Sequence, residues 1–206
     1  MIRTEPVNEA FKELMNELFF YPRTLPKTTN IQWHYFNNTN QNIINVNGHG
    51  GEIAKAFYPR ARSGDSEIDH LISFTKFPEI SKDEVTKWYE DAKPWADKQG
   101  INIADLFYWE QRMGNWGALF PLEQDAAIEE FSPFSNSPLL FALLKTPVQD
   151  RKGPDHQLFK EMIQQMWPET LEYDYNPILG INIKARLTKL VKHNPVLFNI
   201  YKKIKQ

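Results

Sequence analysis

The sequence contains no cysteine among its 206 residues. A disulfide framework, a zinc site built from thiolates and a cysteine nucleophile are therefore all excluded. Because cysteine-free chains are compatible with a reducing compartment, we expect a cytoplasmic location.

Long apolar runs are also missing, since no segment approaches the roughly 20 apolar residues that span a bilayer. The first residues lack the basic and then apolar order of a secretion signal. We therefore expect no transmembrane segment. Glycine is scarce, with 9 residues against 14 prolines, which predicts rather stiff connections between elements.

Charge is unevenly distributed although the net charge is only −2. Residues 181–206 hold seven of the 24 basic residues and no acidic residue, so this tail carries +7 and the preceding part −9. We predict one domain over residues 1–180 and a basic helical tail over 181–206 that packs on it. Nucleic acid or an acidic membrane surface is the alternative contact for such a tail, but we expect no nucleic-acid partner.

Apolar residues recur at helical spacing through most of the chain. Ser81 and Glu84 form a capping box, Gly100 is a helix stop, and Asn102 and Ser137 are expected to cap the helices that follow them. Helical patterns cover residues 7–18, 81–99, 103–113, 123–131, 138–145 and 155–167.

Strand signals are confined to the first fifty residues. Residues 31–36 are a candidate strand, and residues 43–46 read as a short buried strand. This is too little strand to complete a parallel sheet. The predicted fold is mainly α, with one or two short strands near the amino terminus.

Three glycines follow the second of these strands, at Gly48, Gly50 and Gly51, and Glu52 opens a predicted helix. Backbone N–H groups in such a turn can surround an anion, and phosphate or pyrophosphate is the natural guest. The same turn also serves simply to reverse the chain tightly. Likewise, Glu52 suits a magnesium site beside phosphate or the positive end of a helix dipole.

Several segments in order resemble the asparagine-synthetase type of ATP-pyrophosphatase domain, an adenine nucleotide alpha hydrolase-like family. They are the glycine turn from Asn47 to Glu52, the segment Phe107-Tyr108-Trp109-Glu110-Gln111-Arg112-Met113, the turn Ser132-Pro133-Phe134, and the helical segments 139–151 and 158–169. The resemblance implies the helical carboxy-terminal half of a doubly wound α/β domain. It also implies an amidotransferase-like ligase activity, in which full-length relatives use ATP and magnesium to activate a carboxylate and transfer it to nitrogen.

The resemblance implies catalytic positions at His49, Glu52, Arg112 and His156, with Glu52 near the magnesium ion. It implies nucleotide contacts at Gly48, Gly50 and Gly51. His49 stands where an asparagine synthetase has glutamate, and His156 stands near the place of a lysine. Because histidine is charged only at lower pH, the second replacement makes a positive charge at that position conditional on pH.

The family's Ser-Gly-Gly-x-Asp-Ser loop, which holds pyrophosphate, is missing from this sequence. Residues 63–66 read Ser-Gly-Asp-Ser, but they lack one glycine and follow a basic loop instead of a strand. We therefore interpret the chain as a partial ligase domain, inactive alone or completed by a second polypeptide or a homo-oligomer. The alternative is a non-catalytic helical interaction module in a surface-glycan or natural-product pathway, where such ligases also act.

Two further groups of charged residues, one around Glu110 and one at residues 65–70, could form ion pairs or bind a metal ion. Glu110 is expected on a buried helix face, where it either borders a pocket or, as we favour, pairs with Arg112 or Arg151. Arg112 is also expected to stack on Trp116. The acidic stretch at residues 65–70, which ends in His70, offers metal-ligand types. Helical spacing spreads these side chains around the turn, which favours a solvated acidic face.

Overall fold

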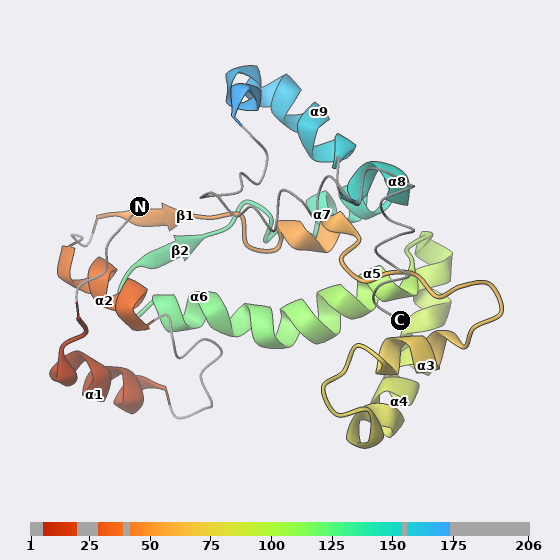
Figure 1. The fold of residues 1–206 in the computed structure, drawn as a ribbon, viewed down its shortest axis with the longest axis horizontal. Coiled ribbons are helices and arrows are strands. Elements are labelled where there is room, and N and C mark those ends of the chain that lie inside the picture. The colour runs from red at the N-terminus through yellow and green to blue at the C-terminus, as the bar shows by residue number, and fades with distance from the viewer. Residues whose placement is uncertain (1–5, 20–28, 39–41, 154–155, 174–206) are drawn as a thin grey trace, which may run out of the picture. The chain divides into compact units, whose positions relative to one another are not determined.

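The computed structural model describes residues 6–19, 29–38, 42–153 and 156–173. The described part is mainly helical, with two short strands, as predicted (Figure 1). Two compact units divide the chain, one over residues 1–158 and one over residues 159–206. The predicted basic tail, residues 181–206, lies outside the described residues.

Helix α1 spans Glu9–Leu18 and begins where the Asn8 side chain accepts a hydrogen bond from the backbone of Ala10. The candidate strand at residues 31–36 is wrong, because this segment lies within helix α2, Thr29–Asn38. Helical spacing places Trp33 and Phe36 on one face, where their rings lie 5.3 and 5.0 Å from the Phe11 ring. This aromatic contact with a distant helix overrides the local strand preference.

Strands β1, Ile44–Val46, and β2, Glu129–Phe131, form a two-stranded parallel sheet. The first strand was predicted, but not as it is found: it was expected to be buried, whereas Ile44 and Val46 are 52% and 64% exposed. The second falls inside a predicted helix, so the expectation that strands stop within fifty residues is wrong. The register places Val46 beside Phe131, and the backbone N–H of Asn47 extends the ladder to the carbonyl of Phe131 at 3.0 Å. Glu130 accepts hydrogen bonds from the side chains of Asn45 and Asn47, which locks this register.

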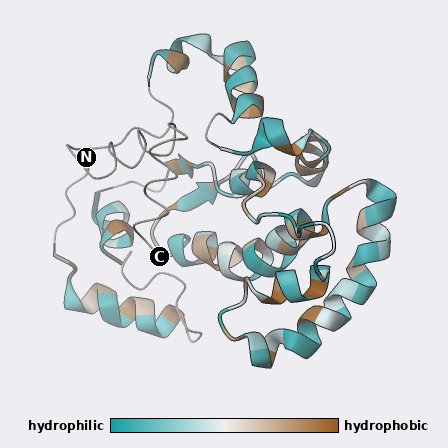
Figure 2. Cartoon of the chain, turned by 45° about the vertical axis from the view of Figure 1, so that its right-hand side comes forward, coloured by the Kyte–Doolittle hydropathy of each residue, from teal (hydrophilic) through white to brown (hydrophobic). Residues whose placement is uncertain are grey.

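A 3₁₀ helix, η2, spans Gly51–Lys55, followed by α3, Glu67–Ile72, and α4, Pro78–Gln99. Helix α4 begins at Pro78 instead of after Ser81, because proline suits the first helical position. It ends at Gly100, whose φ of 68° is the left-handed stop that the sequence predicts. On the side of α4 that faces solvent, most residues are hydrophilic (Figure 2).

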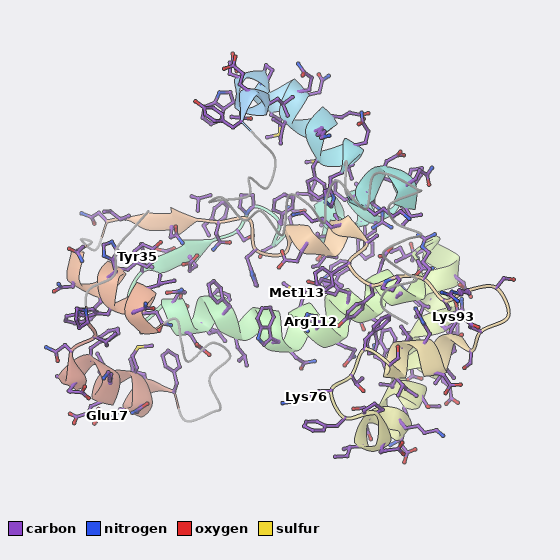
Figure 3. The ribbon with its side chains drawn as sticks, in the orientation of Figure 1. Glu17, Tyr35, Lys76, Lys93, Arg112 and Met113 are labelled. Carbon is purple, nitrogen blue, oxygen red and sulfur yellow. The ribbon has the colours of Figure 1, made fainter. Side chains whose placement is uncertain are left out.

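A continuous helical rod follows, made of α5, Ile103–Phe107, a π-helix η3, Tyr108–Gly117, and α6, Ala118–Gln124 (Figure 1). Asn102 caps it as predicted, accepting from the backbone of Ala104 at 3.0 Å. All five α5 residues are buried, and the four apolar ones join the main core with apolar residues of η2, α3, α4 and α7. Figure 3 marks Arg112 and Met113 on this rod.

Helices α7, Ser137–Leu144, and α8, Val148–Arg151, complete the described part of the first unit. Asn136, not the predicted Ser137, caps α7 by accepting from the backbone of Leu139. Helix α9, Gln157–Met166, matches the predicted 155–167 pattern and leads into a 3₁₀ helix, η4, Pro168–Glu172. Among the described residues, no helix combines the length and apolar character needed to cross a membrane.

Candidate functional site

The predicted nucleotide-binding glycines form a tight turn against an aromatic ring. Gly50 has a φ of 87°, a left-handed conformation that favours glycine, and a Cβ on Gly51 would lie 3.1 Å from the ring of Phe134. The backbone N–H groups of Gly51 and Ile53 bond to Gly48 and Gly50 at 3.0 Å. The turn therefore has a packing role, and two of its amides are already used internally; nucleotide binding by Gly48, Gly50 and Gly51 stays a prediction.

His49 is held from three sides. Its backbone N–H donates to the side-chain oxygen of Asn47 at 2.8 Å, and its carbonyl accepts from the hydroxyl of Ser132. The ring Nε2 lies 2.8 Å from the carbonyl oxygen of Gly117, at the end of the π-helix, and the ring stacks on Phe120. Because a carbonyl oxygen only accepts, this contact requires the proton to be on Nε2.

Glu52 and Arg112, sixty positions apart in the sequence, both act on the hydroxyl of Tyr108. Burial, and secondly the negative charge of Glu52, raise the pKa of Tyr108 to about 12, while Arg112 opposes the shift. The Arg112 guanidinium lies 5.1 Å from the ring centre of Trp116, which confirms the predicted stacking, and 5.9 Å from that of Phe57. Tyr108 and Arg112, on the first turns of η3, thus form one polar group with Glu52 of η2.

The π-helix η3 explains how His49 and Tyr108 are brought to this region. Its buried positions are Tyr108, Met113 and Gly117, and the first interval, five residues, is wider than the three or four that separate neighbours on one face of an α-helix. A Cβ on Gly117 would lie 2.7 Å from Met113 and 3.4 Å from Nε2 of His49, so glycine allows the histidine to approach. Interruptions of this kind are frequent at functional sites. Sequence reasoning missed the π-helix, and the wide spacing was the available signal.

The fourth predicted catalytic residue, His156, lies apart from this group. Its Nδ1 is 3.0 Å from the carbonyl oxygen of Arg151, and its φ is 46°. This contact joins His156 to Arg151, and not to His49, Glu52 or Arg112.

Arg151 is fully buried and organises the region behind the glycine turn. Its guanidinium bonds to the carboxylate of Asp105 at 2.6 Å and to the carbonyls of Ala54 and Thr146 at 3.3 and 2.9 Å. Asp105 is 3% exposed and also lies 3.9 Å from Arg60. This arrangement ties η2, α5 and the start of α8 together.

The expectation that Glu110 is buried and pairs with an arginine is wrong. Its side chain is exposed and accepts a hydrogen bond from the indole N–H of Trp88 at 2.8 Å, whereas Asp105 takes Arg151. Because the π-helix turns less per residue than an α-helix, Glu110 does not lie on the face that regular helical spacing predicts.

The metal-ligand candidates also have other partners. Glu67 accepts from the hydroxyl of Tyr89 and pairs with Lys93, while His70 contacts the carbonyl of Pro59 at 2.8 Å. No group of three or more His, Asp or Glu side chains in the described ranges is arranged to hold a metal ion. Glu52 would therefore need further ligands from elsewhere to bind magnesium.

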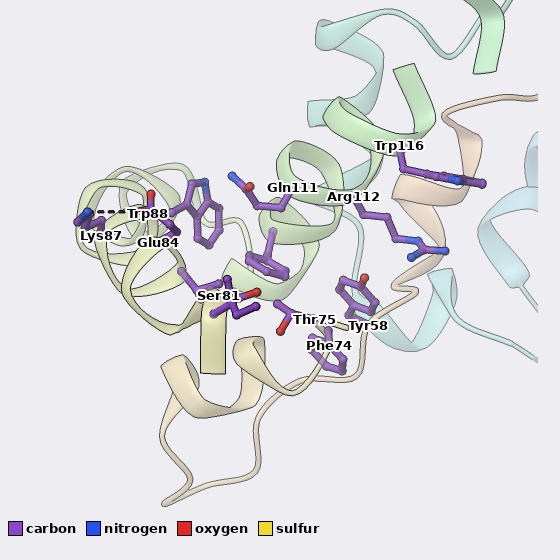
Figure 4. A pocket seen from close by; sticks show the side chains of 13 residues that line it. Tyr58, Phe74, Thr75, Ser81, Glu84, Lys87, Trp88, Gln111, Arg112 and Trp116 are labelled. Atoms are coloured by element: carbon purple, nitrogen blue, oxygen red, sulfur yellow. Dashed lines mark hydrogen bonds and ion pairs between the residues drawn. The ribbon is translucent and has the colours of Figure 1, made fainter. Parts of the chain in front are cut away.

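A cleft of about 700 Å³ opens beside this polar group, between α4 and η3 (Figure 4). Arg112 and Trp116 lie at one end of it, and Glu84, Lys87 and Trp88 lie at the other. Sequence reasoning did not anticipate the cleft, because its walls come from segments between residues 58 and 116 that carry no shared motif.

Comparison with known proteins returned no match to any family model, curated protein or solved structure.

Proposed function

We propose that this chain is the helical part of an asparagine-synthetase-like, ATP-dependent amide-forming ligase, completed by a second polypeptide. The observation that carries the proposal is that three of the four predicted catalytic residues, His49, Glu52 and Arg112, lie on or against one helix, η3. Two of them act on Tyr108 at its start, and His49 contacts Gly117 at its end. The family resemblance selects these three residues from separate segments, so their convergence supports it.

The polar group suits the recognition of a carboxylate-bearing substrate. Arg112 has no carboxylate within 4 Å among the described residues, so its charge is available to an anion. Tyr108, with a pKa of about 12, keeps its proton at neutral pH and can donate a hydrogen bond. Glu52 is suited to accepting a proton from an attacking nitrogen.

ATP and magnesium supply the activation of the carboxylate in this family, and we assign their binding to the second polypeptide. In the described part of the chain Glu52 belongs to no group of three or more potential metal ligands, and the glycine turn uses two of its amides internally. Alone, the chain is expected to be inactive.

The sheet offers a place for the second polypeptide to join. Ile44, Val46 and Phe131 are 52%, 64% and 56% exposed on a sheet that has two strands within the described ranges. Parallel sheets are normally covered on both faces and have more strands than this. Additional parallel strands would cover these apolar side chains.

A non-catalytic interaction module is the second candidate, and the same open sheet favours it. An exposed apolar face calls for a binding partner whether or not chemistry follows. The two candidates differ only in whether Glu52 and Arg112 touch a substrate.

The test is reconstitution with a polypeptide from the same genome that carries the Ser-Gly-Gly-x-Asp-Ser loop. Both chains are purified, mixed, and supplied with ATP, magnesium, candidate amino-acid carboxylates and ammonia. Release of AMP and pyrophosphate is measured for each chain and for the mixture. Glu52→Ala is the test variant, and Glu17→Ala, an exposed change on α1, is its matched control.

The ligase proposal expects turnover in the mixture alone, lost in Glu52→Ala and kept in Glu17→Ala. A stable complex without AMP release would overturn the ligase and favour the interaction module. No complex with any such polypeptide would remove the support for completion in trans.

A further inference from the structure

The cleft between α4 and η3 has the dimensions of a small-molecule site. Its volume of about 700 Å³ falls within the roughly 300–1,000 Å³ typical of ligand pockets. Three helical elements, α4, α5 and η3, form its main walls, and the loop residues Tyr58 and Phe74 close one side. Helical walls of this kind are largely preformed.

Aromatic rings cover much of the cleft, and their mutual packing fixes them. Tyr58 and Phe74 stack with ring centres 4.1 Å apart, and Trp88 meets Phe107 edge to face at 5.0 Å. The indole N–H of Trp88 is engaged by Glu110, which holds that ring in one orientation. A planar ring entering the cleft would find ordered aromatic surfaces.

The side chains that line the cleft carry a net positive charge. Glu84 and Lys87 pair with each other at 3.1 Å, which leaves the guanidinium of Arg112 as the uncompensated charge in the lining. Arg112 is held by Trp116 on one side, so its donors are positioned in advance. The side chains of Ser81 and Gln111 also line the cleft and make no hydrogen bond within the described residues.

We propose that this cleft binds a small molecule that combines a planar aromatic ring with one anionic group, such as a carboxylate. The ring lies against the aromatic walls, and the anion pairs with Arg112. The site shares Arg112 with the polar group of the proposed ligase, but it requires neither ATP nor a second polypeptide. It therefore holds whether or not the ligase proposal does.

Binding is tested on the chain alone with 2-naphthoate, and with 2-naphthol as the neutral companion of the same ring size. Titration calorimetry gives affinity and stoichiometry, and the indole N–H signals in NMR spectra report the location. The expected result is one saturable site for 2-naphthoate, with shifts at Trp88 and Trp116 and none at Trp33 on α2. The neutral probe should bind about tenfold more weakly, since one charge-assisted hydrogen bond contributes this much.

Two variants examine the two halves of the proposal. Arg112→Gln should weaken 2-naphthoate about tenfold and leave 2-naphthol unchanged, while Arg62→Gln, an exposed arginine outside the lining, should change neither. Ser81→Trp fills the cleft and should abolish binding of both probes. Thermal melts followed by circular dichroism establish that each variant is folded.

Equal affinity of Arg112→Gln and the unchanged chain for 2-naphthoate would overturn the proposal. So would several weak sites, shifts centred on Trp33, or undiminished binding in a folded Ser81→Trp variant. Because no nucleotide and no second chain is present, none of these outcomes depends on the ligase reconstitution.

Discussion

Two arginines in the first unit lie in opposite surroundings. We call the buried region around Arg151 the sealed side, and the region around Arg112 and the cleft the open side. Arg151 is fully buried, bonded to Asp105 and to two backbone carbonyls, and it holds the glycine turn against α5. Arg112 is exposed, stacks on Trp116, and lines a cleft. Arginine thus serves two purposes in this unit. A buried arginine whose hydrogen bonds are satisfied stabilises the structure, whereas an exposed arginine without an ion-pair partner at the cleft is available to a ligand.

The sealed side should be the more sensitive to mutation. Arg151→Met removes the close partner of Asp105, which is 3% exposed, and leaves this buried carboxylate with only the more distant Arg60, at 3.9 Å. We expect a loss of about 3–5 kcal/mol in the free energy of unfolding, measured by urea denaturation. Arg112→Met, on the open side, is the matched control and should cost less than about 1 kcal/mol.

A double replacement sharpens this comparison. Asp105→Leu combined with Arg151→Met removes both charges and should recover much of the stability, because apolar pairs often substitute well for buried ion pairs. If Arg151→Met were as stable as Arg112→Met, the division into a sealed and an open side would be wrong.

The glycine turn, on the sealed side, is the next place to test. Gly50→Ala forces alanine into a φ of 87° and should cost about 1–2 kcal/mol. Gly48→Ala adds a methyl group with nothing within 4 Å and without a left-handed φ, so its effect should stay within about 0.5 kcal/mol. Denaturation curves of the two variants compare them directly, and equal losses would contradict the packing account.

Gly48→Ala has a second use because it leaves the fold intact. If a nucleotide from the proposed ligase lies on this turn, the added methyl group should lower AMP release in the reconstituted enzyme. Unchanged turnover would leave the glycines with a packing role alone.

Local patterns in the sequence predicted the elements that depend on local interactions. The helices over 9–18 and 157–166, the Asn102 cap and the Gly100 stop follow from spacing and capping chemistry. The stacking of Arg112 on Trp116 was also predicted, because the two residues are only four positions apart on one helix.

Interactions between distant segments account for what sequence reasoning missed. Strand β2 exists because it pairs with β1, 85 positions earlier, and Arg151 finds Asp105 across 46 positions. Helix α2 is determined by its contact with Phe11. The cleft and the π-helix likewise depend on packing that no single segment encodes, and the predicted partner of Glu110 was wrong for this reason.

Tyr108 stands between the two sides, since Glu52 comes from the glycine-turn helix and Arg112 lines the cleft. Removing the negative charge in Glu52→Gln should lower the pKa of Tyr108 from about 12, and removing the positive charge in Arg112→Gln should raise it. A folded pKa above the ordinary value of about 10 means that stability is fully present below pH 10 and falls as pH rises toward 12. Ultraviolet difference titration against Tyr108→Phe isolates this group from the other seven tyrosines. Shifts of the same sign in both variants would mean that the two charges do not oppose each other at this hydroxyl, and the polar group would lose its basis.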